Sequence, residues 1–305
     1  MSRSRLVGVT VLTGLASLVL GPPGTLLSQA RERSIYVTML DPSGAPVPDM
    51  GPSDFIVRED DVAREVLRVV PATDPMDIAV LLDNSVAAAS AVPVIRQALP
   101  AFLDALMAPA PAGQRNQVAI ITLAGRPTIL ADYAIERAAL DQAIARVWED
   151  TFVGGYYLLN GIIEVTQGLR KRESPRPIIV AITGEGPELS SRHPDQVLEP
   201  LRDSGAALHV ISIGLPAVGI SDDVRDRNAV VDQGPRQSGG THTQLLSSTA
   251  LPGRLQQLAN VLTHAYKVTY GHPDALIPPR RVTVTARRPD VTALGTPIKG
   301  LQAGR

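Results

Sequence analysis

Three polar residues follow directly after an unbroken apolar run, and they mark the place in the sequence best suited to chemistry. Ile78–Leu82 is apolar throughout, and Asp83, Asn84 and Ser85 come next. A continuous apolar run of this length is typical of a strand buried on both faces of a parallel sheet. Residues after such a strand lie at the carboxyl edge, where open α/β sheets bind ligands. The sequence therefore predicts a functional site around Asp83 and Ser85.

The histidines do not indicate an enzyme. They show neither an HExxH pattern nor another spacing that is typical of metal ligands. Ser85, His242 and Asp83 can be combined into a nucleophilic set, but no G-x-S-x-G turn surrounds Ser85. His209 falls in a predicted buried strand, where we expect a hydrogen-bonded core residue. We therefore predict a protein without catalytic residues.

The elements around Asp83 alternate between strands and helices. Apolar runs predict further strands at 117–123, 177–182 and 207–213. Helical spacing of apolar residues predicts helices at 92–106, 140–147, 158–169, 194–203 and 252–265. This alternation predicts an α/β fold, a doubly wound and mostly parallel sheet with helices on both faces.

Two local features of this α/β region lead to further expectations. Pro100 falls within the first predicted helix and should kink it or start a second piece. Residues 216–240 lack a hydrophobic period, and we expect them to form a long exposed loop.

The flanking segments carry short strands instead. Alternation or apolar runs predict strands at 35–39, 55–57 and 66–70, and two more at 266–270 and 281–287. Three short strands are only marginally stable by themselves. We therefore expect residues 31–72 and 266–305 to form one small β unit, with the α/β domain at 73–265 inserted between its halves.

Composition limits the classes of function. The formal net charge is -1, so the chain has no basic field of the kind that binds nucleic acid. It contains no cysteine, which excludes disulfides, thiolate metal sites, a cysteine nucleophile and a bacterial lipoprotein anchor.

The first thirty residues have the features of a secretory signal peptide. Arg3 and Arg5 form a basic start, Leu6–Leu20 an apolar core, and a small-residue cleavage site ends at Ala30. We expect cleavage after Ala30 and export to the periplasm or the cell exterior. If the segment stays uncleaved, it would anchor the protein in the membrane.

Taken together, these motifs resemble a von Willebrand factor A domain. The domain motifs are the strand followed by Asp83-x-Ser85, the pair Gly154-Gly155 before a helix, the strand ending near Gly184, and Ser212-Ile213-Gly214. The flanks resemble a subgroup of exported bacterial proteins with this domain, through Gly44-x-Pro46-Val47, Asp54-Phe55-x-Val57-x-Glu59-Asp60, Leu258-Ala259-Asn260 and Tyr266-x-Val268-x-Tyr270. The resemblance covers roughly residues 34–300 and implies a Rossmann-like sheet.

The resemblance also implies a metal-ion-dependent adhesion site, which this sequence carries in a degenerate form. Family members bind a divalent cation through Asp-x-Ser-x-Ser, a threonine after a glycine pair, and an aspartate that ends a later strand. Asp83 and Ser85 match, whereas Ala87, Tyr156 and Gly184 occupy the other three positions. Alanine and glycine offer no side-chain oxygen, and Mg²⁺ requires six oxygen ligands.

We therefore expect no required cofactor, and at most binding of Mg²⁺ or Mn²⁺ at about millimolar affinity. Such binding would use Asp83 and Ser85 with a substitute ligand, chosen from Glu185, Thr183, Thr151 and Asp150. In the other interpretation, Asp83 and Ser85 only cap the following helix or satisfy loop amides.

From the resemblance we also expect a partner protein to bind at the carboxyl edge. The predicted partner-binding residues are Ser85, Tyr156, Tyr157, Glu185 and His242. The two tyrosines could anchor an interface. Alternatively, Tyr157 packs beneath the loop and Tyr156 fills the vacated metal pocket.

The resulting hypothesis is a non-catalytic, exported interaction module that binds an unidentified protein without an essential metal. We expect it to bind neither nucleic acid nor a small-molecule substrate. One alternative is a cation-dependent adhesion module that uses Asp83 and Ser85. Another is a structural or assembly subunit of a cell-envelope complex.

Overall fold

The central sheet of the larger domain contains six strands. In chain order they are β5 (Met76–Leu82), β6 (Gln117–Thr122), β7 (Thr128–Ala134), β8 (Arg176–Gly184), β9 (Ala207–Ile213) and β10 (His242–Leu245). Their order across the sheet is β10-β9-β8-β5-β6-β7. All pairs are parallel except β6 with β7, so β7 is an antiparallel edge strand that the sequence analysis did not identify. The structure, a computed structural model, describes residues 31–108, 115–149, 154–216, 221–273, 279 and 281–296.

The two central strands explain why the apolar runs are continuous. Every residue of β5 and β8 is buried, because helices cover both faces of the sheet. Leu82 pairs with Ile182 on one side and Thr122 on the other, so the strands end at a common edge. Asp83 and Gly184 therefore emerge at the same carboxyl edge, as the sequence predicts.

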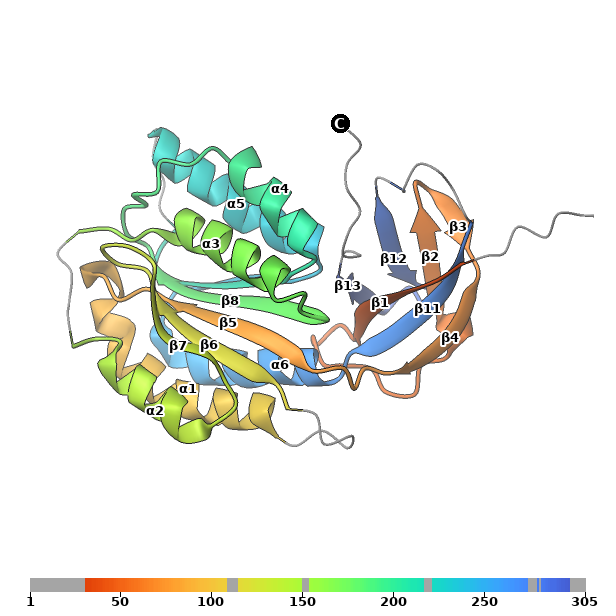
Figure 1. Ribbon diagram of the computed structural model, residues 1–305, viewed down its shortest axis with the longest axis horizontal. Helices are drawn as coiled ribbons and strands as arrows, with labels where there is room; N and C mark the ends of the chain where they lie inside the picture. The colour runs from red at the N-terminus through yellow and green to blue at the C-terminus, as the bar shows by residue number, and fades with distance from the viewer. Residues whose placement is uncertain are drawn as a thin grey trace, which may run out of the picture.

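Helices form one layer on each side of this sheet, as Figure 1 shows. The first layer contains α1 (Val92–Met107), α2 (Arg137–Arg146) and α6 (Leu251–Thr263), and the second contains α3 (Leu158–Lys171), α4 (Asp195–Ser204) and α5 (Asp222–Ser238). Alternate residues of β5 serve the two layers: Ile78 and Val80 pack with the first, Ala79 and Leu81 with the second. The predicted doubly wound, mostly parallel α/β fold is confirmed.

Helix α5 corrects the expectation of a long loop at 216–240. Its buried positions include Arg227, Gly234 and Ser238 beside only a few valines, so the helical period is weak in any hydrophobicity pattern. The two acidic residues in its first turn suit the positive end of the helix dipole. Its C-terminal end is marked by Gly239 in the left-handed conformation (φ 76°).

Helix α1 runs without interruption through Pro100, so no second helix starts there. Together with the preceding 3-10 turn η2 (Val86–Ala91) it is long and apolar enough to cross a membrane, by length and composition alone. Its apolar face, with Ile95, Leu99 and Phe102, is buried against the sheet. Within the described residues this is therefore a core helix of the domain.

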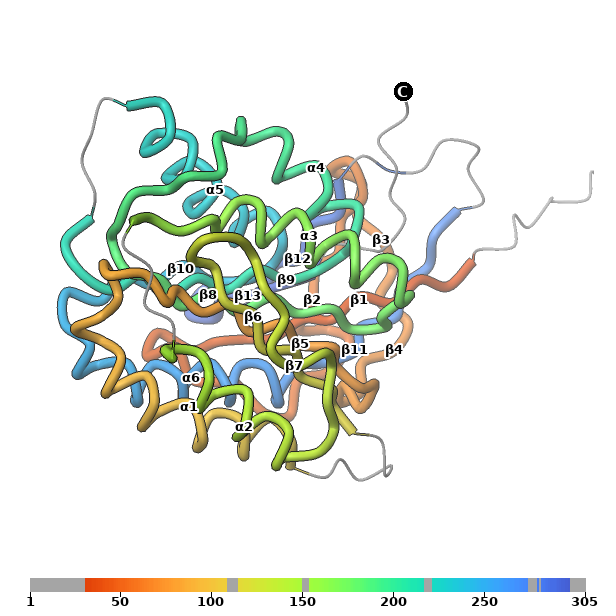
Figure 2. Tube along the Cα trace, turned by 60° about the vertical axis from the view of Figure 1, so that its left-hand side comes forward, coloured from red at the N-terminus to blue at the C-terminus, as the bar shows by residue number. Residues whose placement is uncertain are grey.

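The smaller part of the molecule is built from both ends of the described chain. Its strands are β1 (Arg31–Leu40), β2 (Phe55–Glu59), β3 (Val62–Arg64), β4 (Val66–Pro71), β11 (Tyr266–His272), β12 (Val282–Ala286) and β13 (Thr292–Gly295). They form two antiparallel sheets, β13-β1-β11-β4 and β12-β2-β3. Figure 2 shows how the N-terminal and C-terminal strands lie together. The predicted β unit made from both flanks is confirmed.

A buried carboxylate stabilises this β unit. Glu59 lies at the end of β2 and accepts hydrogen bonds from Tyr270 (3.0 Å), His272 (2.8 Å) and Arg64 (2.9 Å). Burial acts to raise the pKa of Glu59, but the bonds from His272, Tyr270 and Arg64 outweigh it and lower the pKa below its ordinary value. The carboxylate therefore joins β2 to β3 and β11. The turn after β2 contains Asp60 and Asp61, both in the left-handed conformation.

Candidate functional site

The positions that correspond to the adhesion-site ligands lie together at the carboxyl edge of the central sheet. The Asp83 N–H donates to the Ile182 carbonyl at 3.0 Å, which joins the end of β5 to the end of β8. Gly184 contacts Ala87 so closely that an added Cβ would lie 2.9 Å from its backbone. The structure thus brings together two positions whose side chains lack oxygen ligands.

Asp83 and Asn84 connect the loops at this edge. Asp83 accepts from the Ser85 N–H (2.8 Å) and the Gly184 N–H (2.9 Å), and Asn84 accepts from the Ala124 N–H (2.8 Å). Burial raises the pKa of Asp83, while these hydrogen bonds and the charge of Arg227 oppose that rise. Asp83 thus satisfies loop amides. Ser85 precedes η2, and its side chain makes no capping hydrogen bond.

Arg227 supplies a positive charge at this edge that the sequence analysis missed. Helix α5 places its Nη1 2.8 Å from Glu185 Oε2, and the two side chains are 5% and 7% exposed. Burial acts to lower the pKa of Arg227, but Tyr156 and Glu185 raise it overall. The acidic first turn of α5, followed by Val230 and Val231 on one face, was the available signal for this helix.

The predicted partner-binding residues occupy different positions from those expected. Tyr156 is fully buried, and its backbone bonds with Pro187 and Leu189 join it to the loop after β8. Burial raises the pKa of Tyr156. Ser85 is also buried, as is the side chain of Glu185. The burial of Tyr156 agrees with the alternative in which it fills the vacated metal pocket, whereas Ser85 and Glu185 are not the exposed contacts expected of partner-binding residues.

The remaining two predicted partner-binding residues are more accessible. Tyr157 is half-buried just before α3, and its N–H donates to the Leu123 carbonyl at 2.9 Å. His242 is exposed, and its backbone pairs with Val210 in the middle of β9, whereas its side chain lies close enough to Arg227 and Glu185 for both charges to act on its pKa, which burial lowers. Its Nε2 lies 3.3 Å from Ser212 Oγ, and among the described residues it forms no hydrogen bond with Ser85. The paired Ser85/His242 set is thus not assembled here.

The residues at this edge do not fit a divalent cation. Asp83 and the hydroxyls of Ser85 and Thr183, which are buried without a hydrogen-bond partner in the described part of the chain, could supply oxygens. However, Ala87 and Gly184 supply none, and a buried guanidinium already acts on Asp83. Within the described ranges no three His, Cys, Asp or Glu side chains lie close enough to hold a metal ion. Asp150 and Thr151 lie outside the described residues.

A groove opens over these buried residues. It has a volume of about 470 Å³ and is lined by small residues, including Ala87, Ala88 and Gly184. Leu215 and Leu246, which follow β9 and β10, also line it and are 77% and 72% exposed. The groove therefore combines two exposed leucines with polar residues, namely Glu185 and the serines Ser90, Ser247 and Ser248.

Comparison with known proteins finds likeness at the level of structure. No family model matches the sequence, and no curated protein matches it. Proximal thread matrix protein 1 from the mussel byssus, solved with a zinc-occupied MIDAS motif, is 17% identical with a TM-score of 0.51. The match covers 70% of this chain and 50% of that protein, so this chain spans about half of its length.

Two bacterial structures are also similar. A von Willebrand factor type A protein from Catenulispora acidiphila is 10% identical with a TM-score of 0.47, over 90% of this chain and 75% of that one. An aerotolerance-related membrane protein from Bacteroides fragilis is 15% identical with a TM-score of 0.44, over 61% and 98%. At these identities the likeness concerns the fold alone.

Proposed function

Because the larger domain has the fold of a von Willebrand factor A domain, we propose that this chain is a non-catalytic protein–protein interaction module. Its partner binds the groove at the carboxyl edge without an essential metal. The observation that carries the proposal is the buried pair of Arg227 and Glu185, of which Glu185 lines that groove. Export after cleavage behind Ala30 is part of the proposal, although residues 1–30 lie outside the described part of the chain. The proposal also includes the division of the chain into a β unit, made of residues 31–72 and 266–305, and an α/β domain at residues 73–265.

The charge arrangement supports independence from metal. In the adhesion sites of the family a partner's carboxylate completes the coordination of the cation. Here the positive charge is a guanidinium that Glu185 already pairs at 2.8 Å, so it offers no open coordination position. A second cation beside Arg227 would be repelled in a poorly solvated site. The partner's contact is therefore not a metal-bound carboxylate.

The exposed leucines support an apolar contact instead. Leu215 and Leu246 line the groove together with alanines, glycines, serines and Glu185, and both leucines are largely exposed to solvent. Burying a leucine side chain fully is worth about 1.5–3 kcal/mol. Clustered apolar residues at the centre of a surface are where binding energy concentrates in interfaces. The partner accordingly inserts an apolar side chain into this groove.

The test compares partner retention by three versions of the mature protein. The wild type, a Leu215→Ser/Leu246→Ser variant and an Ile129→Ser control are immobilised and exposed to a cell-envelope extract. Ile129 is 60% exposed on β7, away from the groove. We expect the double variant to lose at least about tenfold in retention of a partner that the control retains. Addition of a chelator should change nothing.

Other outcomes select the alternatives. Loss of the partner on chelation, together with saturable Mg²⁺ or Mn²⁺ binding in calorimetry, would favour a cation-dependent module using Asp83 and Ser85. Equal retention by the double variant and the control would reject the groove as the binding site. A chain that forms a stable oligomer without any groove-dependent partner would instead be a structural or assembly subunit.

A further inference from the structure

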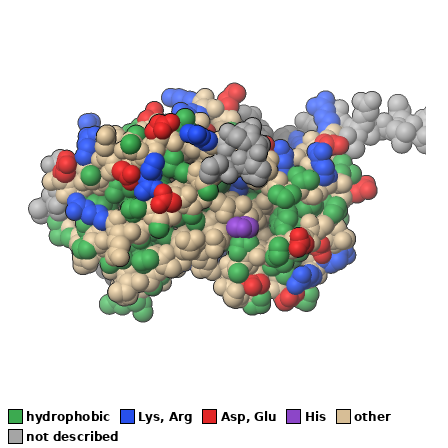
Figure 3. All heavy atoms as spheres, turned by 90° about the horizontal axis from the view of Figure 1, so that it is seen from below, with side chains coloured by type: hydrophobic (Ala, Val, Ile, Leu, Met, Phe, Trp, Pro, Cys, Tyr) green, Lys and Arg blue, Asp and Glu red, His purple; other side chains and the backbone are tan. Residues whose placement is uncertain are grey.

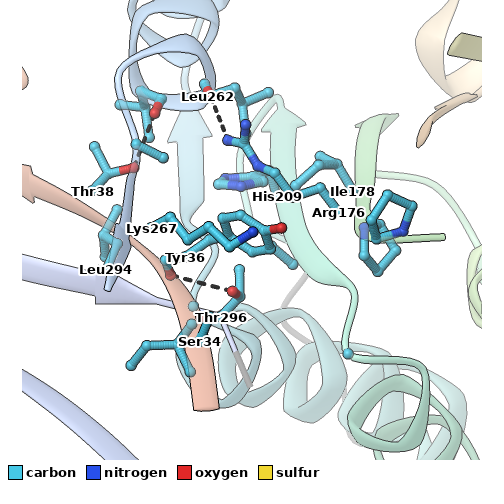
Figure 4. A pocket seen from close by; sticks show the side chains of 18 residues that line it. Ser34, Tyr36, Thr38, Arg176, Ile178, His209, Leu262, Lys267, Leu294 and Thr296 are labelled. Atoms are coloured by element: carbon cyan, nitrogen blue, oxygen red, sulfur yellow. Dashed lines mark hydrogen bonds between the residues drawn. The ribbon is translucent and has the colours of Figure 1, made fainter. Parts of the chain in front are cut away.

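A second cavity lies at the amino edge of the central sheet, at the opposite end of the strands from the proposed docking groove. It has a volume of about 300 Å³ and is lined by the starts of β8 and β9, the end of α6, and strands β1, β11 and β13. It therefore lies where the β unit meets the amino edge of the α/β domain, at the junction of the two lobes seen in Figure 3. Figure 4 shows its lining side chains.

Arg176 gives this cavity a buried positive charge. The residue is 5% exposed, and its Nη2 donates to the Leu262 carbonyl at 2.7 Å. Its Nε is buried without a hydrogen-bond partner, and in the described part of the chain no carboxylate lies within ion-pair distance. The guanidinium lies over the Tyr36 ring, 5.0 Å from its centroid. Burial lowers the pKa of Arg176 to about 10, so it remains charged at neutral pH.

The other polar groups in the wall add no negative charge beside Arg176. Lys267 brings a second cation, which pairs with Asp74 at 3.1 Å; this carboxylate is not among the lining residues, but its charge also acts on Arg176 and opposes the effect of burial on its pKa. His209 is neutral at physiological pH, because burial lowers its pKa to about 3, and its Nδ1 lies 3.1 Å from Thr241 Oγ1. The lining residues include no aspartate or glutamate. The cavity wall therefore favours an anion.

The remaining walls are apolar or aromatic. Ile35, Ile178, Leu262 and Leu294 line the cavity beside the Tyr36 ring. A volume of about 300 Å³ is at the lower end of those found for small-molecule sites. A planar carboxylate matches the fork of a guanidinium and can accept two of its N–H groups. A small ligand with an apolar body and one carboxylate satisfies both parts of the cavity.

We propose that this junction cavity binds a small organic carboxylate, whose carboxylate pairs with Arg176. The apolar body lies between the β unit and the sheet, so the bound ligand contacts both parts of the molecule. This site is separate from the docking groove, and it departs from the expectation that the protein binds no small molecule. The physical basis is that a buried guanidinium with an unpaired donor gains more from an anion than an exposed one does.

The test uses three probes of equal size and different charge: benzoate, neutral benzamide and cationic benzamidine. Each is titrated into the whole mature protein by calorimetry and thermal-shift measurement, at matched ionic strength. We expect benzoate to bind at least about tenfold more tightly than benzamide, and benzamidine not to bind. Similar affinities for all three, or no binding of benzoate below about 10 mM, would overturn the proposal.

Two variants test the residue itself. Arg176→Met should reduce benzoate affinity at least about tenfold and leave benzamide unaffected. Arg96→Met is the matched control, since Arg96 also lies over an aromatic ring, that of Trp148 at 5.2 Å, and is not among the residues that line the cavity. Equal benzoate binding by Arg176→Met and the control would refute the assignment. The wild-type probe series decides the proposal if Arg176→Met fails to fold.

Discussion

Replacing Arg227 by methionine is the sharpest test of the charge arrangement under the carboxyl edge. The substitution keeps much of the side-chain volume but removes the guanidinium that pairs with Glu185, whose side chain is 7% exposed. Removing one partner of a buried ion pair costs about 3–5 kcal/mol, because the other charge stays buried and uncompensated. We therefore expect Arg227→Met to lower the free energy of unfolding by about that amount.

A double-mutant cycle separates the free energy of the Arg227–Glu185 interaction from the effect of shortening the Arg227 side chain. The double variant Arg227→Met/Glu185→Gln removes both charges, so it should be more stable than Arg227→Met alone. Arg225→Met is the control on the same helix, because Arg225 pairs with Asp222 at the exposed surface. Exposed pairs contribute about 0–1 kcal/mol, so this variant should change little. Urea unfolding at pH 7 measures the wild type, the single variants Arg227→Met and Glu185→Gln, the double variant and the control.

The same variant tests whether Arg227 excludes a cation. Without the guanidinium, Asp83, Glu185 and the Thr183 hydroxyl are left to supply oxygens. If Mn²⁺ then binds with Kd of about 1 mM, 10 mM Mn²⁺ adds about 1.4 kcal/mol of stability to Arg227→Met and nothing to the wild type. The reasoning is refuted if Arg227→Met loses less than about 1 kcal/mol, or if the double variant loses the sum of the two single changes.

Three further predictions concern the backbone and pH. A Cβ added at Gly155 would lie 1.9 Å from the Pro187 carbonyl oxygen. A Cβ added at Gly168 in α3 would have no neighbouring atom within 4 Å. Gly155→Ala should thus unfold at markedly lower urea concentration, while Gly168→Ala should gain about 0.5–1 kcal/mol; equal shifts would contradict this. Glu59 has a lowered folded pKa, so its stabilisation is present above its ordinary value of 4.5 and is lost as pH falls through the folded pKa. The stability difference between wild type and Glu59→Gln should therefore shrink below pH 4.5, and a constant difference would disprove this role. His209 also has a lowered folded pKa, about 3 against 6.5, so the unfolded chain takes up the proton first as pH falls. Relative to His209→Asn, the wild type should lose about 1.4 kcal/mol per pH unit below about pH 6; parallel pH curves would show that the imidazole is not held neutral.

The sequence determined the framework of this protein. Ile78–Leu82 and Pro177–Ile182 are apolar without interruption because helices cover both faces of β5 and β8. The sequence of each strand therefore indicates that the strand is buried. The chemistry of Asp83 at the end of β5 follows from its position, because parallel strands end at a common edge. The closing of the β unit by β11 and β12 was also predictable, since a few short N-terminal strands are only marginally stable by themselves.

Only the tertiary structure decided what this edge and the junction contain. Arg227 and Arg176 are charged residues, and a local pattern assigns such residues to the surface. Their burial depends on partners far away in the sequence: Glu185 for Arg227, and the Leu262 carbonyl and Tyr36 ring for Arg176. Periodicity reports which face of an element is apolar, whereas the pairing of a buried charge is fixed when separate elements pack. The sequence thus determined where the edges lie, and packing determined which charges they hold.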